Sequence, residues 1–369
     1  MLTQAYRGKR VLITGHTGFK GSWLAEWLLA LGAEVTGYSL PPPTVPALFD
    51  QLGIAARLQH IEGDVRDLPK LRHAVEAARP DFVFHLAAQS LVRLSYREPV
   101  ETYSTNIMGT VNVLEAVRLA GRSCTVVAIT TDKCYKNQEW LHGYREEDPL
   151  GGYDPYSSSK GAAELVISAY RQSYFSSAGS AVRLASARAG NVLGGGDWAV
   201  DRIMPDCIRA LQREETIAVR NKGSTRPWQH VLEPLSGYLL LGAQLASLPA
   251  GPSVATLASA FNFGPALASN RTVVELVEEV LKHWPGRWDD KADAGAVHEA
   301  RQLNLATDKA RHLLRWEPVW SFEQSIAQTV QWYRHAHAHT NPERIPAFTL
   351  GQIAAYTAEA RARNIAWSA

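Results

Sequence analysis

The chain has 369 residues, of which 46% are hydrophobic and 20% charged, the proportions of an ordinary globular protein. This length exceeds what one compact domain usually needs, so we expect two lobes. The formal net charge is only +2, and no basic run is interleaved with aromatic residues. Nucleic acids and membrane surfaces are therefore not expected as partners.

The chain also lacks the signals of secreted, membrane and metal-binding proteins. Its three cysteines, Cys124, Cys134 and Cys207, have no paired spacing, and its histidines have no ligand spacing. This pattern predicts neither a disulfide scaffold nor a metal site. The first ten residues form a short polar segment, unlike a signal peptide. The longest uncharged stretch, 234–270, is interrupted by prolines and glycines, unlike a membrane span. We expect a soluble, cytoplasmic protein.

Strand and helix patterns alternate through the first half of the chain. Strands are predicted at 11–14, 34–38, 60–64, 82–86, 125–129 and 180–189, and helices at 23–31, 71–78, 106–119 and 156–174. This alternation is typical of a doubly wound α/β fold with a parallel sheet. After residue 190 the alternation weakens. We expect residues 1–190 to form the sheet domain, 191–345 a smaller, discontinuous lobe interleaved with returning sheet elements, and 346–369 a helical tail.

A glycine-rich turn joins the first strand to the first helix. It reads Gly15-His-Thr17-Gly18-Phe19-Lys-Gly21. Glycines at this spacing allow a tight turn and let the backbone approach a pyrophosphate, which the N–H groups of the helix start can bind. A glycine-rich turn without a ligand is the alternative. The position directly after the first buried strand favours a Rossmann-type dinucleotide site.

The second and third strands bear on which dinucleotide is bound. The second strand ends in Tyr38-Ser-Leu-Pro41, without the acid that usually binds the adenosine ribose. No arginine follows to bind a 2′-phosphate, which favours NAD without deciding the matter. Asp64 and Val65, after the third strand, are candidates for the adenine. Asp64 could equally cap the helix that begins near Leu68.

Two groups of proton carriers follow. Tyr156 and Lys160 are four residues apart on one helical face, where an ammonium group can lower the pKa of a phenol so that it serves as a base. Asp132 and Lys133 come directly after Thr131 and supply an acid and an amine. The first pair suits removal of a proton from an alcohol. The second suggests chemistry beyond oxidation.

These residues resemble a known superfamily. The glycine turn, His85-Leu86-Ala87-Ala88-Gln89, Thr131 and Tyr156-x-x-x-Lys160 are similar to motifs of the extended short-chain dehydrogenases/reductases. Thr131-Asp132-Lys133 resembles the nucleotide-sugar 4,6-dehydratases within it. Relatives that act on dTDP-glucose have Asp-Glu where this chain has Asp-Lys. The strings Arg188-Ala-Gly-Asn-Val192, Gly194-Gly-Gly-Asp-Trp198 and Arg226-Pro-Trp-Gln-His230 resemble the branch that acts on CDP-hexoses.

The resemblance, which covers roughly residues 8–335, implies a reaction. Tyr156 would take the C4 hydroxyl proton while the C4 hydride passes to NAD; Lys160 would hold the nicotinamide ribose, and Thr131 would bind the reacting oxygen. Asp132 would then protonate the departing C6 hydroxyl, and Lys133 would take the C5 proton. Hydride return to C6 leaves a 4-keto-6-deoxy sugar, which in bacteria feeds the synthesis of surface polysaccharides.

The elimination makes a demand on protonation. A free carboxyl is ionised and a free amine is protonated at pH 7, which is the opposite of what the reaction needs. Burial favours the neutral forms, whereas a close ion pair would oppose them, so the two groups could share one proton. A surface salt bridge after a strand end is the alternative reading of Asp132 and Lys133.

The resemblance also implies binding residues. Cofactor contacts are expected from Gly15, Thr17, Gly18, Phe19, Gly21, Asp64, Val65, Leu86, Ala87, Ala88, Tyr156 and Lys160, and substrate contacts from Gln89, Arg93, Asn191, Arg202, Arg226 and Arg301. Gln89 and Arg93 could instead brace a loop, and Arg226 could be a surface residue. Trp198 and Trp228 could line the cleft or belong to the core.

Other functions remain open at this point. A nucleotide-sugar 4-epimerase of the same fold needs Thr131 and Tyr156 but no elimination pair, and a 4,6-dehydratase could act on another nucleotide hexose. A non-catalytic dinucleotide sensor is a third reading. Members of the superfamily commonly pair two helices of each subunit. The matching helices here, 106–119 and 156–174, predict a homodimer or homotetramer.

Overall fold

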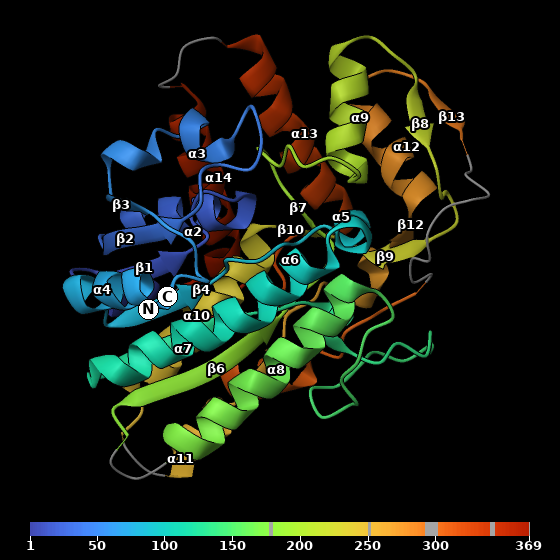
Figure 1. Cartoon of the computed structure of the whole chain (residues 1–369). Helices are drawn as coiled ribbons and strands as arrows, with labels where there is room; N and C mark the ends of the chain where they lie inside the picture. Colours follow the sequence, from blue (N-terminus) through green and yellow to red (C-terminus); the bar gives the residue numbers. More distant parts are fainter. Residues whose placement is uncertain (177–179, 250–251, 292–301, 340–343, 369) are drawn as a thin grey trace.

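The structure is a computed structural model that describes residues 1–176, 180–249, 252–291, 302–339 and 344–368 (Figure 1). Its centre is a seven-stranded sheet in the order β11-β6-β5-β4-β1-β2-β3, in which every neighbouring pair is parallel. The strands are β1 (Arg10–Thr14), β2 (Glu34–Ser39), β3 (Gln59–Glu62), β4 (Phe82–His85), β5 (Cys124–Ile129), β6 (Val182–Arg188) and β11 (Ala260–Asn262). The predicted Rossmann-type fold is confirmed.

Helices cover both faces of the sheet, as the alternation of buried residues along β1 requires. Val11 and Ile13 join one hydrophobic cluster, and Leu12 joins the other. The first cluster includes residues of α2 (Phe19–Ala30), α10 (Leu232–Ser247) and α14 (Arg344–Ala362). The second includes residues of α4 (Leu68–Ala78), α7 (Gly109–Ala120) and α8 (Pro155–Tyr174), which lie in front of the sheet in Figure 1.

A smaller lobe lies beyond the carboxyl ends of the strands. Its elements are β7 (Val192–Leu193), α9 (Ile203–Gln212), β8 (Ile217–Val219), β9 (Thr225–Pro227), β10 (Gln229–His230), β12 (Asn270–Thr272), α12 (Val273–His283), β13 (Trp288–Asp290) and α13 (Phe322–Ala338). Its strands form three two-stranded sheets: β10 with β7, β12 with β9 and β13 with β8. Between these segments, α10 and β11 return to the central sheet. The lobe is therefore discontinuous in sequence.

Short helices complete the chain. They are α1 (Leu2–Tyr6), α3 (Leu48–Gln51), η1 (Ile54–Ala56), α5 (Val92–Arg97), α6 (Pro99–Tyr103), η2 (Ser104–Met108), η3 (Asp132–Cys134), α11 (Pro252–Leu257), η4 (Leu267–Ser269), η5 (Ala310–Leu314) and η6 (Ala366–Ser368). Within the described ranges, no helix is both long enough and apolar enough to cross a membrane.

Two local predictions need correction. The helix predicted at 106–119 begins as a π-helical turn, η2, in which the Asn106 side chain donates to the Gln89 carbonyl and to the Ser159 hydroxyl. Asp64 does not cap α4. Asp67 does, because its carboxylate accepts a hydrogen bond from the backbone N–H of Lys70 at 3.0 Å.

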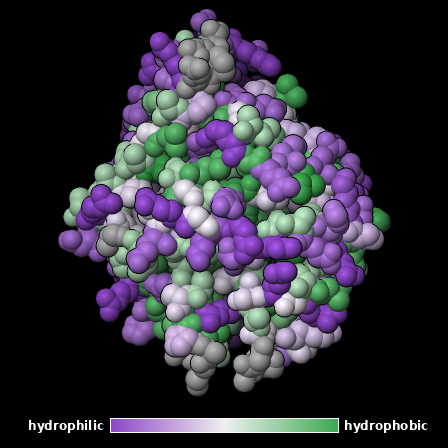
Figure 2. Space-filling view, turned by 90° about the vertical axis from the view of Figure 1, so that its left-hand side faces the viewer, coloured by the Kyte–Doolittle hydropathy of each residue, from purple (hydrophilic) through white to green (hydrophobic). Residues whose placement is uncertain are grey.

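Strand β3 forms one edge of the sheet, and its residues disfavour pairing with a further strand. It is short, and Gln59, His60 and Glu62 are exposed. Polar side chains on a short edge strand discourage pairing with another chain. The corresponding face of the molecule mixes hydrophilic residues with small groups of hydrophobic ones (Figure 2).

The C-terminal segment packs against α2. Trp27 of α2 makes edge contacts with the rings of Tyr356 and Trp367, each at 5.9 Å between centroids. The fully buried Glu233 of α10 accepts hydrogen bonds from the Tyr356 hydroxyl at 2.7 Å and from the backbone N–H of Trp320 at 2.7 Å. The tail is thus joined to the core through both apolar and polar contacts.

Candidate active site

A cavity of about 770 Å³ lies between the carboxyl ends of the sheet strands and the smaller lobe. This is where ligands bind in open α/β sheets. Arg301 lies outside the described residues, so its predicted role stays a prediction. All the other predicted site residues line the cavity: Gly15, Thr17, Gly18, Phe19, Gly21, Asp64, Val65, Leu86, Ala87, Ala88, Gln89, Arg93, Thr131, Asp132, Lys133, Tyr156, Lys160, Asn191, Arg202 and Arg226.

The glycine turn forms a cradle for a phosphate group. Gly15 has a φ of +79°, and a Cβ there would lie 2.7 Å from the backbone nitrogen of Ala87. A Cβ on Gly21 would lie 2.1 Å from the carbonyl oxygen of Gly15. Gly18 is the N-cap of α2, and no side chain caps the helix. The N–H groups of the first turn therefore remain available to an anion, which fits a dinucleotide pyrophosphate.

Asp64 lines the cavity, and Arg66 binds its side chain. The Arg66 guanidinium binds its carboxylate at 2.5 Å and also binds Glu101. The hydrogen bond from Arg66 holds the pKa of Asp64 below its usual value. Asp64 is therefore an ionised hydrogen-bond acceptor at the cavity wall. At the end of β2, the Thr17 hydroxyl lies 2.7 Å from the Ser39 hydroxyl.

Tyr156 and Lys160 lie on the first turns of α8, which Asp154 caps by accepting from the N–H of Ser157 at 2.9 Å. Burial raises the pKa of Tyr156 to about 12, against the lowering effects of a hydrogen bond with Thr131 and the charge of Arg202. The sequence reading expected Lys160 to lower this pKa. That expectation is wrong for the protein alone, because burial has the larger effect. Burial also lowers the pKa of Lys160 itself to about 8.

Asp132 and Lys133 belong to η3, a 3₁₀ turn of three residues directly after β5. Asp132 is only 1% exposed. Its Oδ1 accepts from the Thr131 hydroxyl at 2.9 Å, and its Oδ2 accepts from the side-chain amide of Asn191 at 3.3 Å. Among the described residues, no ion pair within 4 Å joins it to Lys133. The alternative of a surface salt bridge is therefore wrong.

The segment after β6 presses against this carboxyl group. Asn191 adopts a left-handed backbone conformation with a φ of 49°. A Cβ on Gly190 would lie 1.9 Å from Oδ2 of Asp132. Only glycine leaves room for the carboxyl group at this position, and the turn of the chain at Asn191 directs the amide toward it.

A buried ion pair lies one helical turn beyond Lys160. Glu164, one turn after Lys160 on α8, binds Arg188 of β6 at 2.8 Å, and both side chains are less than 5% exposed. The same carboxylate accepts hydrogen bonds from Thr130 and Ser186. The pair thus joins α8 to the ends of β5 and β6, where the reactive side chains stand.

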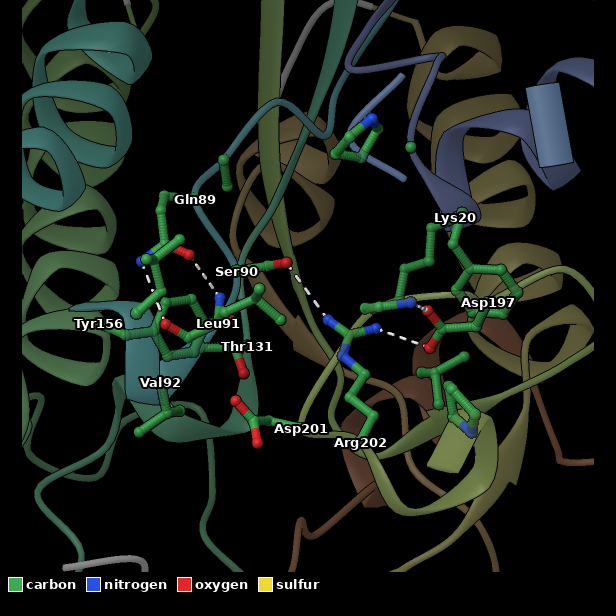
Figure 3. A pocket seen from close by; sticks show the side chains of 18 of the residues that line it. Lys20, Gln89, Ser90, Leu91, Val92, Thr131, Tyr156, Asp197, Asp201 and Arg202 are labelled. Carbon is green, nitrogen blue, oxygen red and sulfur yellow. Dashed lines mark hydrogen bonds and ion pairs between the residues drawn. The ribbon is translucent and has the colours of Figure 1, made fainter. Parts of the chain in front are cut away.

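Polar residues from both lobes face each other across the cavity (Figure 3). Arg202 binds Asp197 at 2.9 Å and Ser90 at 3.2 Å. Gln89 is committed to its own loop, since its side chain bonds Leu91 and Thr102. Bracing the loop is therefore its visible role.

The remaining predicted substrate residues differ in exposure and partners. The Arg93 guanidinium lies 3.9 Å from the carboxylate of Asp201. Arg226 is 8% exposed and donates to the carbonyl of Thr225, so the alternative that it is a surface residue is wrong. Trp198 and Trp228 line the cavity while their indole N–H groups bond Gln51 and Arg271. Both readings of these tryptophans therefore hold in part.

Sequence reasoning missed Lys20, Ser90 and Asp197. Lys20 lies inside the glycine turn, and Asp197 lies inside the Gly194–Trp198 string, so their motifs were noticed but their side chains were not assigned. Burial and the nearby charge of Arg202 lower the pKa of Lys20 to about 8. The position of Lys20 beside a phosphate-binding turn could have identified it as a site residue. No sequence signal marks Ser90.

Comparison with known proteins agrees with this geometry. A family model described as GDP-mannose 4,6 dehydratase matches residues 12–329. A CDP-glucose 4,6-dehydratase of Salmonella typhimurium is 48% identical over 333 residues, which cover 89% of this chain and 91% of that protein. The chain belongs to the nucleotide-sugar 4,6-dehydratase family. The predicted family is thus confirmed.

Solved structures of this family and its superfamily share the fold. The dTDP-glucose 4,6-dehydratase of Streptomyces venezuelae, with NAD bound, has a TM-score of 0.75 and 25% identity; the match covers 89% of this chain and 98% of that one. A UDP-glucose 4-epimerase of Thermus thermophilus, also with NAD, has a TM-score of 0.74 at 24% identity and covers 89% and 99%. The epimerase likeness shows the fold alone. The 4,6-dehydratase relationship rests on the family model and the Salmonella relative.

Proposed function

We propose that this 4,6-dehydratase converts CDP-D-glucose and releases CDP-4-dehydro-6-deoxy-D-glucose and water. One observation carries the proposal: Thr131, Asp132 and Lys133 face Tyr156 and Lys160 in one cavity. The first three follow β5, and the other two lie on α8. Elimination chemistry is thus added to an oxidation site. The 48% identity to the Salmonella enzyme supports CDP-glucose as the substrate.

The residues that would hold the cofactor fit NAD. The turn from Gly15 to Gly21 would bind the pyrophosphate, Asp64 and Val65 the adenine, and Lys160 the nicotinamide ribose. When bound, NAD accepts hydride from C4 of the sugar and returns it to C6. Calorimetric titration with NAD and NADP tests the choice, and we expect NAD to bind more tightly. Tighter binding of NADP would contradict it.

The oxidation step depends on Tyr156. As a phenolate it takes the proton of the C4 hydroxyl. Its raised pKa makes the phenolate a strong base once formed, and the charge of Arg202 favours that form. The hydroxyl of Thr131 positions the phenol.

The elimination step depends on η3. Oxidation at C4 acidifies the C5 proton, which Lys133 removes. Asp132 donates a proton to the C6 hydroxyl, which leaves as water. Asn191 and Thr131 hold the two oxygens of the Asp132 carboxyl, so its orientation is fixed before the substrate arrives.

The substrate is tested by incubating the protein with CDP-, UDP-, GDP- and dTDP-glucose and identifying the products by mass spectrometry. We expect water loss and a 4-keto-6-deoxy product, fastest from CDP-glucose. A C4 stereoisomer that keeps its C6 hydroxyl would indicate the epimerase instead. Faster dehydration of another nucleotide sugar would identify that sugar as the preferred substrate instead.

The role of Lys133 has its own test. We expect Lys133→Ala to lose exchange of the C5 proton with solvent while C4 oxidation continues. Lys136→Ala is the matched control, because Lys136 is exposed and lies outside the cavity wall. Unchanged C5 exchange in Lys133→Ala would require another base.

Arg301→Ala, at a residue predicted from the sequence alone, is expected to raise KM for the substrate.

The oligomeric state follows from an exposed apolar surface, which we infer to be a subunit interface. Met108, beside α7, is 51% exposed; Leu165 of α8 is 61% exposed, and Val100 of α6 is 81% exposed. A two-fold pairing of α7 and α8 with a second copy would bury them and give a homodimer, or a homotetramer if dimers pair again. Light scattering of Leu165→Glu tests this: a monomer is expected, and an unchanged mass would contradict it.

We also propose that the protein is cytoplasmic. Cys124, Cys134 and Cys207 are all buried and free, which suits a reducing compartment. Its product would enter the synthesis of deoxysugars for bacterial surface polysaccharides. Fractionation of cells that express the protein should place it with the cytoplasmic fraction, and recovery with membranes would contradict this.

A further inference from the structure

The carboxyl end of β2 meets the cavity without the charged residue that a dinucleotide site usually has there. In Rossmann-type folds an acid about 20 residues beyond the glycine turn accepts a hydrogen bond from the adenosine ribose. In this chain Ser39 is the last residue of β2, and it lines the cavity. Residues 39–49 contain no charged side chain. Recognition of the ribose by this segment therefore depends on neutral groups.

Two hydroxyl groups lie close together at this strand end. The Ser39 hydroxyl is 2.7 Å from the hydroxyl of Thr17, which belongs to the glycine turn. Thr17 also donates a hydrogen bond to the backbone carbonyl of Leu40 at 2.9 Å. Thr17 is 3% exposed and Ser39 is 7% exposed, and both line the cavity. The pair therefore joins the glycine turn to the end of β2.

The number of available protons decides which hydroxyl donates within the pair. A hydroxyl has one proton to donate and two lone pairs that accept. The Thr17 proton is used on the Leu40 carbonyl, so the contact between the two hydroxyls requires Ser39 to donate and Thr17 to accept. The Ser39 proton is then used as well. Toward a ligand in the cavity, the Ser39 oxygen is therefore an acceptor.

An acceptor at this position distinguishes a ribose hydroxyl from a ribose phosphate. A 2′-hydroxyl can donate to the Ser39 oxygen, whereas a 2′-phosphate presents acceptor oxygens and needs donors or cations. None of the cationic residues lining the cavity within the described ranges belongs to β2 or to the segment that follows it. They are Lys20, Arg93, Lys133, Lys160, Arg202, Arg220 and Arg226.

The neighbouring strand β3 leads to a group with net negative charge. The Tyr38 hydroxyl donates to the backbone carbonyl of Asp64 at 2.9 Å, which brings Asp64 beside the end of β2. Arg66 binds both Asp64 and Glu101, so one cation faces two carboxylates and the group has a net charge of −1. A phosphate group beside Ser39 would be close to this like charge, which disfavours it.

We propose that Ser39, oriented by Thr17, selects NAD over NADP by accepting a hydrogen bond from the 2′-hydroxyl of the adenosine ribose. Ser39 is the specificity-determining residue. Thr17 is a positioning residue, because it takes the Ser39 proton and leaves the Ser39 oxygen as an acceptor. The assignment rests on the proposed function for its cofactor, and it names the group that replaces the missing acid.

Calorimetric titration with three ligands tests the role of Ser39. The ligands are NAD, NADP and an NAD analogue whose adenosine ribose lacks the 2′-hydroxyl. Wild-type protein should bind the deoxy analogue about fivefold more weakly than NAD, the usual contribution of one neutral hydrogen bond. Ser39→Ala should weaken NAD by the same factor and leave the affinity for the deoxy analogue unchanged. Equal weakening of NAD and the analogue in Ser39→Ala would overturn the assignment.

A matched control variant lies on the same segment. Thr44 lines the cavity, but its hydroxyl donates to the carbonyl of Pro46 at 2.8 Å. Thr44→Val removes this hydroxyl and should leave the ratio of the affinities for NAD and the deoxy analogue as in the wild type. A ratio that falls as far as in Ser39→Ala would overturn the assignment to Ser39. Circular dichroism checks that each variant is folded, and the comparison of the two ligands in wild-type protein needs no variant.

The positioning role of Thr17 has a separate readout. Thr17→Val removes the acceptor of the Ser39 proton, so Ser39 becomes able to donate, and the preference for NAD over NADP should fall. Thr17→Ser keeps the hydroxyl and should keep the preference. An unchanged preference in Thr17→Val would show that Thr17 does not orient Ser39.

The outcomes separate this inference from the proposed function. The titrations contain no sugar nucleotide, so they do not depend on the dehydration reaction. Wild-type protein that binds the three ligands as expected but dehydrates no nucleotide hexose overturns the proposed function alone. Wild-type protein that dehydrates a nucleotide hexose but binds NAD and the deoxy analogue equally well overturns the assignment of Ser39 alone.

Discussion

The two halves of the site are built in different ways. Tyr156 and Lys160 stand on α8, a helix of 20 residues whose Glu164 is tied to Arg188 by a buried ion pair. Asp132 stands on a turn of three residues, and its carboxyl group is positioned by single contacts from Thr131 and from the Gly190–Asn191 segment.

This difference indicates where substitutions should change each proposed step of the reaction. The oxidation half depends on the packing of a whole helix against the sheet, so a change in its supports should affect folding. The elimination half depends on local contacts of one loop. It can therefore be altered while the fold remains.

The largest effect is expected at the centre of the oxidation half. Tyr156→Phe removes the base, so turnover should fall by about 10³-fold in steady-state assays of product formation. Tyr153→Phe is the control, since Tyr153 is 78% exposed and lies outside the cavity wall. Full turnover in Tyr156→Phe would refute the proposed oxidation site.

The next test concerns the support of that half. Glu164→Gln leaves the buried guanidinium of Arg188 without its counter-charge, which should lower the free energy of unfolding by about 3–5 kcal/mol in urea titrations. Asp81→Asn breaks the more exposed pair with Arg10 and should cost much less, because solvent screens that pair. Similar costs for both variants would remove the contrast between helix packing and surface contacts.

The elimination half should respond in the opposite way. In Gly190→Ala the new methyl group displaces the Asp132 carboxyl, so elimination should slow about 10²-fold while oxidation and stability change little. Gly223→Ala is the control, because a Cβ there meets nothing within 4 Å. A large loss of stability in Gly190→Ala would mean that this half, too, is held by the fold.

The smallest effect lies outside both halves and helps to assign pH profiles. Burial raises the pKa of Glu233 to about 7, so the folded state binds this proton more tightly than the unfolded state. Its contribution to stability is complete below the unfolded pKa and is lost as the pH rises toward 7. Between pH 5 and 7 we expect a decrease of about 2 kcal/mol in the unfolding free energy, which Glu233→Gln should remove. An unchanged pH slope in that variant would assign the dependence to other groups.

Much of the fold followed from the sequence because its signals are local. The apolar runs of β1 and β4 and the glycine turn after β1 are features of consecutive residues, and the structure confirms them. The cap of α4 was harder, because Asp64 and Asp67 are both suitable residues near the helix start. Only the geometry identifies Asp67.

Contacts between distant segments could not be predicted. The amino-acid sequence around Asn191 indicates neither its left-handed backbone conformation nor its contact with Asp132, which lies 59 residues earlier. The pKa of Tyr156 was predicted in the wrong direction. The sequence shows the helical partner Lys160 but not the depth of burial, which has the larger effect.

The contact between Trp27 and the tail has a consequence for synthesis of the chain. The unit formed by β1 and α2 is synthesised well before Tyr356 and Trp367, whose rings pack against Trp27 on its helix. Until then this apolar face has no partner and is open to non-specific association. Packing around α2 is therefore complete only after Tyr356 and Trp367 have been synthesised, although the glycine turn that precedes this helix is made much earlier.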